Sequence, residues 1–154
     1  MKISVNPIGI IHSPFTKPED IPKPKKYDPY RFETTQGEIE VYPEYQEGLK
    51  DIDGFSHLII LFSFHKSKKI HLTAHPPMDN KPRGIFATRS PHRPNLIGMS
   101  VVKLLSRKDN ILKISGIDMI EGTPLLDIKP YTQRDLKEDI RLGWIDSVSP
   151  KVSK

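Results

Sequence analysis

The chain has 154 residues, of which 36% are hydrophobic and 28% are charged, a size and balance typical of a single globular domain over residues 1–154. The absence of cysteine excludes disulfides, a thiolate nucleophile and cysteine-ligated zinc. No apolar run approaches the roughly 20 residues that a membrane-spanning helix needs, and no signal-peptide core follows Met1, so we expect a cytoplasmic protein without membrane contact.

Strands dominate the elements that the sequence predicts, because fifteen prolines and nine glycines interrupt it too often for long helices. In chain order we expect strands over residues 5–11, 37–42, 58–64, 97–105, 112–117, 125–129 and 144–148. The second of these alternates apolar and polar side chains, which predicts that Ile39 and Val41 point inward. The third is apolar on both faces, which is typical of a central strand deep in the core.

Two short helices and one long loop complete the predicted elements. A helix is expected over residues 43–50, where Pro43 suits the first helical position, and another over residues 134–140. Four prolines and many charges predict a surface loop over residues 16–31. The predicted fold class is therefore mainly β, with one or two short helices.

Basic residues are concentrated in the middle of the chain. Residues 54–108 contain ten lysines and arginines and a single acid, Asp79, although the net charge of the whole chain is only +5. Clustered cations gain affinity for phosphates by releasing counterions, so one interpretation is an anionic partner on this surface. A solvated basic face is the other interpretation, and charge alone leaves both open.

The most informative segment, residues 82–100, reads Pro-Arg-Gly-Ile-Phe-Ala-Thr-Arg-Ser-Pro-His-Arg-Pro-Asn-Leu-Ile-Gly-Met-Ser. Its prolines restrict the backbone before binding, so less ordering entropy is lost when a ligand binds. We expect the donors of Arg89, Arg93 and Asn95 to meet a carboxylate or phosphate. The alternative is a loop between strands whose polar groups bond neighbouring backbone.

A second segment, residues 118–131, reads Asp-Met-Ile-Glu-Gly-Thr-Pro-Leu-Leu-Asp-Ile-Lys-Pro-Tyr. Gly122 would let a ligand approach the main chain closely, and the following strand would hold Asp127 and Tyr131 at fixed positions. A purely structural turn is the alternative, because Gly-Thr-Pro is also ordinary hairpin chemistry.

Histidines at positions 65, 71 and 75 are the remaining candidates for a metal site. His71 and His75 would share a face only on a helix, and the prolines at 76 and 77 disfavour one there. Supporting hydrogen bonds or phosphate contacts are simpler roles, so we expect no metal.

Together the two segments resemble the TsaA-like family of tRNA (adenine-37-N6) methyltransferases. The family pattern Phe-Ala-Thr-Arg-Ser-Pro-x-Arg-Pro-Asn-x-Ile-Gly-x-Ser occurs at residues 86–100, and Gly-Thr-Pro-x-Leu-Asp-Ile-Lys-Pro-Tyr at residues 122–131. Weaker similarity at residues 8–15, 49–58 and 64–66 extends the resemblance over nearly the whole chain. It implies a single-domain β-barrel that binds S-adenosylmethionine and works as a homodimer; no Gly-x-Gly-x-x-Gly fingerprint is present.

The resemblance also implies which residues bind the cofactor. They follow the early loop, the central strand and the two motifs: Pro22, Lys23, Pro24, His65, Lys66, Arg89, Met99, Ile120, Glu121, Gly122 and Thr123. Many members have Pro-Arg-Gln at the position of Pro22-Lys23-Pro24, so there we expect the main-chain contact to persist while the side-chain contact changes. Many bacterial members also carry an additional C-terminal domain. We therefore expect tRNA contacts from the barrel or from a partner subunit.

The implied reaction is N6-methylation of threonylcarbamoyladenosine in the tRNA anticodon loop, which mainly requires alignment of nucleophile, methyl carbon and sulfur. A urea-type N–H is acidic enough for a modest base, and Asp127 and Tyr131 are the catalytic candidates, with an inward hydrogen-bonded core pair as the alternative. Substrate or tRNA contacts are expected from Arg83 and Arg93, which suit the threonyl carboxylate, and from Asn95, Lys68 and Lys69.

Two other functions stay open at this point. A non-catalytic nucleic-acid-binding β-barrel would explain the basic middle of the chain. A methyltransferase that uses S-adenosylmethionine on a small molecule is the second, because fold and cofactor do not fix the substrate.

Overall fold

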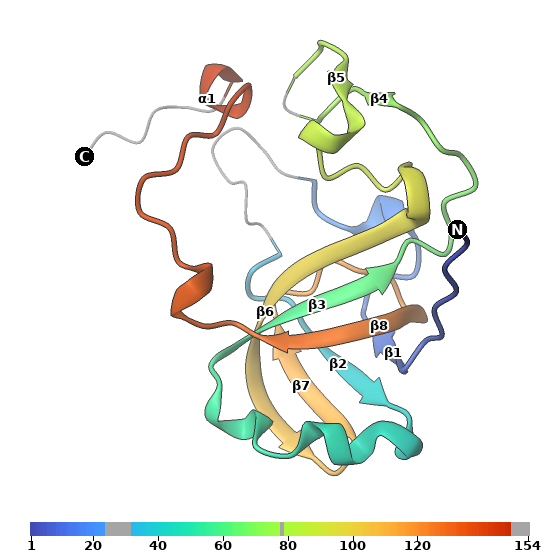
Figure 1. Ribbon diagram of the computed structural model, residues 1–154, viewed down its shortest axis with the longest axis vertical. Coiled ribbons are helices and arrows are strands. Elements are labelled where there is room, and N and C mark those ends of the chain that lie inside the picture. The colour runs from blue at the N-terminus through green and yellow to red at the C-terminus, as the bar shows by residue number, and fades with distance from the viewer. Residues whose placement is uncertain (24–31, 78, 149–154) are drawn as a thin grey trace.

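Six antiparallel strands close into a barrel in the computed structural model, which describes residues 1–23, 32–77 and 79–148 (Figure 1). Around the barrel the order is β1-β2-β7-β6-β3-β8. The bounds are β1 Gly9–His12, β2 Gln36–Val41, β3 His57–Ser63, β6 Ile97–Lys108, β7 Ile111–Ser115 and β8 Thr123–Pro130. A separate two-stranded sheet pairs β4 (Thr73–Ala74) with β5 (Arg83–Gly84). The predicted mainly β barrel is confirmed.

The core fills the inside of this barrel with one face of each strand. Ile39 and Val41 are 0% and 2% exposed, so their predicted inward orientation is confirmed. β3 lies between β6 and β8, as expected of a central strand. Only its alternate residues, such as Ile60, are fully buried, while Ile59 and Leu61 stay half-exposed. A closed barrel buries one face of a strand and leaves the other outside, so two-sided burial was wrong for this strand.

Helical structure is short and mostly of the 3-10 type. The bounds are η1 Pro18–Asp20, η2 Pro43–Leu49, η3 Ile52–Gly54, η4 Ile85–Ala87, η5 Pro94–Leu96, η6 Gln133–Asp135 and α1 Ile145–Val148. The helix predicted at residues 43–50 is therefore η2, in a tighter form. No helix among the described residues is long and apolar enough to cross a membrane.

Two predicted elements near the C-terminal end were wrong. The helix expected at residues 134–140 is only the 3-10 turn η6, which begins where Asp135 caps the Thr132 amide at 2.9 Å and ends at the extended backbone of Leu136. The strand expected at 144–148 is the helix α1, because the Asp146 carboxylate accepts from the Leu142 amide at 3.2 Å and closes a helical turn. Local side-chain bonds of this kind compete with strand pairing and escape a pattern of apolar residues.

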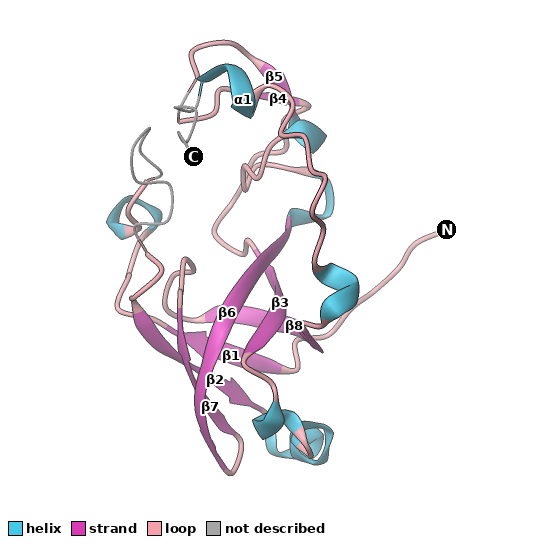
Figure 2. Cartoon of the chain, turned by 90° about the vertical axis from the view of Figure 1, so that its left-hand side faces the viewer, coloured by secondary structure: helices cyan, strands magenta, loops and turns pink. Residues whose placement is uncertain are grey.

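The two ends of the barrel carry different segments. η2 and η3 lie at one end, at the bottom of Figure 1, and the β4–β5 sheet and α1 lie beyond the other end. Figure 2 shows β4, β5 and α1 grouped together above the strands of the barrel. We call the upper one the loop end and the lower one the η2 end.

Candidate functional site

A cavity of about 970 Å³ opens at the loop end of the barrel. Ligand sites for small molecules typically have volumes of roughly 300–1,000 Å³. Its lining comes from stretches far apart in the sequence, within residues 18–23, 62–67, 86–93, 97–99 and 118–123, together with Phe32. The arginine-rich and glycine-centred segments of the sequence therefore meet at one cavity.

Aromatic side chains form an apolar wall of this cavity. Phe62 and Phe64 pack edge to face with their ring centroids 5.1 Å apart. Gly98 faces the Phe62 ring so closely that a Cβ at this position would overlap it. The glycine thus allows the ring to approach β6 closely, and Phe86, 76% exposed, also lines the cavity.

Hydrogen bonds within the arginine-rich loop hold it in shape. The Arg93 guanidinium donates through Nη1 to the carbonyl of Thr88 at 2.8 Å and to that of Ser90 at 3.3 Å. Asn95 is exposed and adopts a left-handed backbone (φ 65°), which asparagine tolerates. Arg93 lines the cavity but donates hydrogen bonds to carbonyls of its own loop, whereas Arg89 lines the cavity and is exposed.

Arg83 lies outside the cavity lining and is held by other groups. Its Nε and Nη2 donate to the Asp79 carboxylate at 2.8 and 2.6 Å. The hydrogen bond from Arg83 holds the pKa of Asp79 below its usual value. On its other side the guanidinium lies 5.5 Å from the centre of the Trp144 ring, whose indole N–H donates to the Ala87 carbonyl at 2.7 Å. Arg83 therefore joins the loop to the C-terminal segment.

A half-buried acid at the inner wall of the cavity was missed by the sequence reasoning. Asp118 accepts a hydrogen bond at 2.5 Å from Ser100, which is only 7% exposed on β6. Burial raises the pKa of Asp118, while the Ser100 hydrogen bond and the charge of Arg89 act in the opposite direction. The available signal was a serine that interrupts the apolar inward positions of β6 between Gly98 and Val102.

Most of the residues assigned to the cofactor by resemblance do line the cavity. They are Pro22, Lys23, His65, Lys66, Arg89, Met99, Ile120 and Thr123. Burial lowers the pKa of His65, a shift that the neighbouring Lys66 charge reinforces. Pro24 lies outside the described residues.

Glu121 and Gly122 instead shape the turn behind the cavity. The Glu121 carboxylate pairs with His12 Nδ1 at 2.7 Å and accepts from the Ser13 amide at 2.8 Å. Gly122 has a left-handed backbone (φ 79°), and its amide donates to the Ile11 carbonyl at 2.9 Å. These bonds fix the turn that presents Ile120 and Thr123 to the cavity.

Exposed lysines stand on the loop that follows β3. Lys66 lines the cavity, whereas Lys68 and Lys69 are exposed beside it. Ser67 supports this loop, since its hydroxyl lies 2.7 Å from His92 Nδ1 and 3.2 Å from the Lys69 carbonyl. The arrangement leaves these ammonium groups in solvent next to the cavity.

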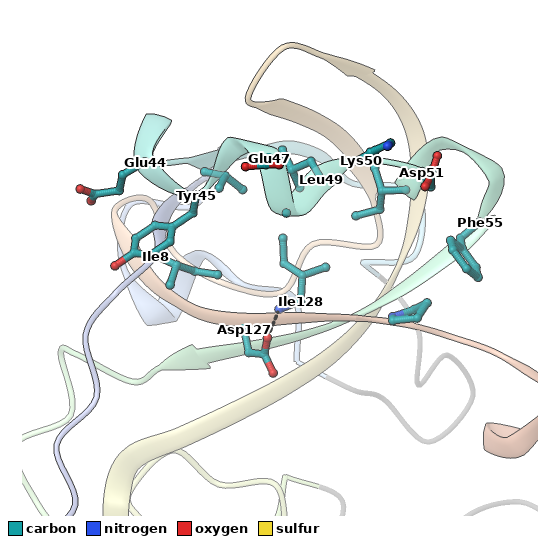
Figure 3. Close-up of a pocket in the computed structure, with 14 residues that line it drawn as sticks. Ile8, Glu44, Tyr45, Glu47, Leu49, Lys50, Asp51, Phe55, Asp127 and Ile128 are labelled. Carbon is teal, nitrogen blue, oxygen red and sulfur yellow. Dashed lines mark hydrogen bonds between the residues drawn. The ribbon is translucent and has the colours of Figure 1, made fainter.

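Asp127 is separated from the cavity by the geometry of β8. It lies in the lining of a second cavity of about 540 Å³ at the η2 end, where its carboxylate and the Ile128 side chain stand on opposite sides of the strand (Figure 3). A β-bulge makes Leu61 pair with Asp127 but Phe62 with Leu125, so Asp127 takes the outward face that simple alternation gives to its neighbours.

Neither catalytic candidate belongs to an inward core pair. The Asp127 side chain is 43% exposed and forms an ion pair with Lys129 at 2.9 Å. Tyr131 is half-buried, with its ring centroid 6.2 Å from that of His57. On the outer face Asp127 is two strands from Met99, about 10 Å at ordinary strand spacing. The catalytic role of both residues stays a prediction.

The histidines considered for a metal are dispersed. His71 lies edge-on to His92, with ring centroids 5.7 Å apart, and His75 Nδ1 lies 3.2 Å from the Asn80 carbonyl. In the described part of the chain no three His, Cys, Asp or Glu side chains gather as metal ligands would.

Comparison with known proteins gives consistent matches. Residues 10–135 match the family model of the tRNA-methyltransferase O N-terminal domain. A probable S-adenosyl-L-methionine-binding protein of Pyrococcus abyssi is 47% identical over 100% of this chain and 82% of its own length. The human tRNA (adenine(37)-N6)-methyltransferase is 37% identical over 81% of this chain and 29% of its own.

A solved structure extends the match to three dimensions. The crystal structure of TrmO from Pseudomonas aeruginosa superimposes with a TM-score of 0.75 and 38% identity, covering 93% of this chain and 62% of that chain. The chain therefore spans less than two thirds of the human relative and of the solved TrmO chain.

Proposed function

The chain belongs to the TrmO family of S-adenosylmethionine-dependent tRNA methyltransferases, and on that premise we propose that it methylates N6 of threonylcarbamoyladenosine at position 37 of tRNA. The observation that carries the proposal is the convergence of both family segments on one cavity of about 970 Å³. The site is proposed to act on the anticodon loop, in the cytoplasm and as a homodimer.

The residues of the cavity fit S-adenosylmethionine by their chemistry. Phe62, Phe64 and Met99 offer an apolar wall for a flat adenine ring. Arg89 offers planar donors for a carboxylate, and Asp118 offers an acceptor on the inner wall. When bound, the cofactor supplies an electrophilic methyl group carried on a sulfonium.

The chain's own contribution is mainly orientation. The Arg93 bonds to Thr88 and Ser90 shape the loop before any ligand binds, so Arg89 is presented with little further ordering. Alignment of this kind replaces a large part of the entropy that two free reactants would lose. Removal of the urea proton remains assigned, as a proposal, to Asp127 or Tyr131, which requires the substrate to reach the outer face of β8.

Recognition of tRNA is proposed to use cations around the cavity. Lys66, Lys68 and Lys69 are exposed there, and such side chains can follow phosphates. Arg93 suits the threonyl carboxylate of the modified base and lines the cavity, whereas Arg89 is assigned to the cofactor. The proposed roles of Arg83 and Asn95 are weaker on this geometry, because neither lines the cavity.

The test is mass spectrometry of nucleosides after incubation with S-adenosylmethionine and tRNA. Threonylcarbamoylated tRNA should gain one methyl on the modified nucleoside, and tRNA that lacks the modification should gain none. Methylation of unmodified adenosine would refute the proposed substrate. Saturable cofactor binding with no methyl transfer to any tRNA would favour a small-molecule substrate, and no cofactor binding would favour a purely RNA-binding barrel.

A further inference from the structure

The cavity lining contains charged side chains of both signs. Its lining is rich in cations, with Lys23, Lys66, Arg89 and Arg93. The acids in the lining are Glu19, which is exposed on η1, and Asp118, which lies on the inner wall. Asp118 is therefore the recessed carboxylate of a largely cationic cavity.

Asp118 is placed by buried neighbours. Ile117 and Met119, on either side of it, are 0% and 2% exposed, so the backbone at this point is fixed in the core. Ser100 donates to one carboxylate oxygen at 2.5 Å and ties the residue to β6. Every buried side-chain nitrogen and oxygen of the described residues has a hydrogen-bond partner. The Ser100 bond satisfies one carboxylate oxygen of Asp118, and the residue also lines the cavity.

A recessed carboxylate is stable when a cation or several donors meet it. Arg89 lines the same cavity, and its positive charge acts on Asp118. A guanidinium beside a carboxylate is complementary to a zwitterion, in which a carboxylate lies next to an ammonium. The amino-acid end of S-adenosylmethionine is such a zwitterion.

We propose that Asp118 and Arg89 together bind the amino-acid end of the cofactor, with Asp118 accepting from its α-ammonium group and Arg89 donating to its α-carboxylate. Ser100 is a positioning residue that holds the Asp118 carboxylate. The inference rests on the proposed function only in that S-adenosylmethionine occupies this cavity. It does not depend on the identity of the tRNA nucleoside.

Two analogues of the cofactor isolate this contact. S-Adenosylhomocysteine keeps the amino-acid end, and 5′-methylthioadenosine lacks it; neither carries the sulfonium charge. In calorimetric titrations, Asp118→Asn should raise the Kd for S-adenosylhomocysteine about 10- to 100-fold, the range expected for a lost charged hydrogen bond. The Kd for 5′-methylthioadenosine should change less than about twofold. Arg89→Ala should show the same selectivity.

Glu47→Gln is the matched control, because it removes an acid that lines the second cavity, at the η2 end. It should leave both affinities unchanged. Equal weakening of both analogues by Asp118→Asn would overturn the proposal in favour of a contact to the adenosine or a general change of the cavity. An effect on S-adenosylmethionine but not on S-adenosylhomocysteine would overturn it in favour of the sulfonium, and no effect on any ligand would also overturn it.

Ser100→Ala keeps the proposal testable if the Asp118 variant does not fold, as judged by circular dichroism and thermal unfolding. It keeps the carboxylate but removes its hydrogen bond, so the same selective weakening should appear at about 3- to 10-fold. Unselective weakening would count against the proposal. If the unmodified protein binds none of the three ligands, the proposed function itself fails, a result distinct from loss of selectivity.

Discussion

The two ends of the barrel are made by the same strands but present opposite charges. At the loop end the cavity lining contains Lys23, Lys66, Arg89 and Arg93 against Glu19 and Asp118. At the η2 end the lining contains Glu44, Glu47, Asp51 and Asp127 against Lys50. An anionic tRNA should therefore be attracted more strongly to the loop end than to the η2 end. The strands are common to both ends, so the loops make the difference in charge between them.

The shared core should be the most sensitive part, because both ends depend on it. Ile60 is completely buried inside the barrel, and Ile60→Ala should lower the free energy of unfolding by about 2–5 kcal/mol. Urea denaturation followed by circular dichroism measures this. A loss well below that range would mean that the barrel core is not the common support of the two ends.

Removing a cation at one end should separate the ends by activity. Arg89→Ala should reduce kcat/KM for methyl transfer to tRNA about 100-fold, equivalent to roughly 2.7 kcal/mol of transition-state stabilisation. Lys50→Ala, the control at the η2 end, should leave it within about twofold. Similar losses in the two variants would contradict the assignment of function to the loop end.

The exposed lysines of the loop end should control the salt dependence of tRNA binding. Replacing Lys68 and Lys69 by alanine should weaken binding about tenfold and reduce the slope of log K against log salt by up to about two, one for each phosphate contact. Filter binding at several salt concentrations gives both quantities. An unchanged slope would assign these lysines to solvent.

The C-terminal segment should contribute a smaller effect at the loop end. Trp144→Phe keeps the ring near Arg83 but removes the indole N–H that bonds the Ala87 carbonyl, which should destabilise this contact by about 1 kcal/mol. Hydrogen exchange should then rise in residues 83–93 and stay constant in η2. Trp144 is the single tryptophan of the chain, so its fluorescence in the unmodified protein also reports whether cofactor binding disturbs this contact.

The smallest expected effect is a pH dependence of folding stability that arises from Glu121, in the turn behind the cavity. Burial works against ionisation of Glu121, but hydrogen bonds from the Ser13 amide and His12 hold its pKa below the ordinary value of 4.5. A lowered folded-state pKa contributes stability that is present above the unfolded value and is lost as pH falls through the folded one. Because both side chains are more than a third exposed, we expect under about 1 kcal/mol. Thermal unfolding measured from pH 6 to pH 3 should show this loss of stability, and Glu121→Gln should make the loss smaller.

Residues with a regular local pattern were predictable, as Ile39 and Val41 illustrate by their alternation in β2. Asp127 was not, because the bulge opposite Leu61 and Phe62 reverses its face and depends on a partner strand. The cavity could be inferred from two motifs that meet there. Asp118 and Ser100 are 18 residues apart, and their contact exists only after β6 and the following segment have packed together.

Closure of the barrel also limits how copies of this chain can associate. Each of its six strands already has a neighbour on both sides, so the barrel offers no free backbone edge to which another strand could add. Assembly of the proposed homodimer therefore cannot extend the barrel sheet. Among the exposed apolar residues of β6, Val101 and Leu105 lie outside the lining of the larger cavity and are open to such a contact.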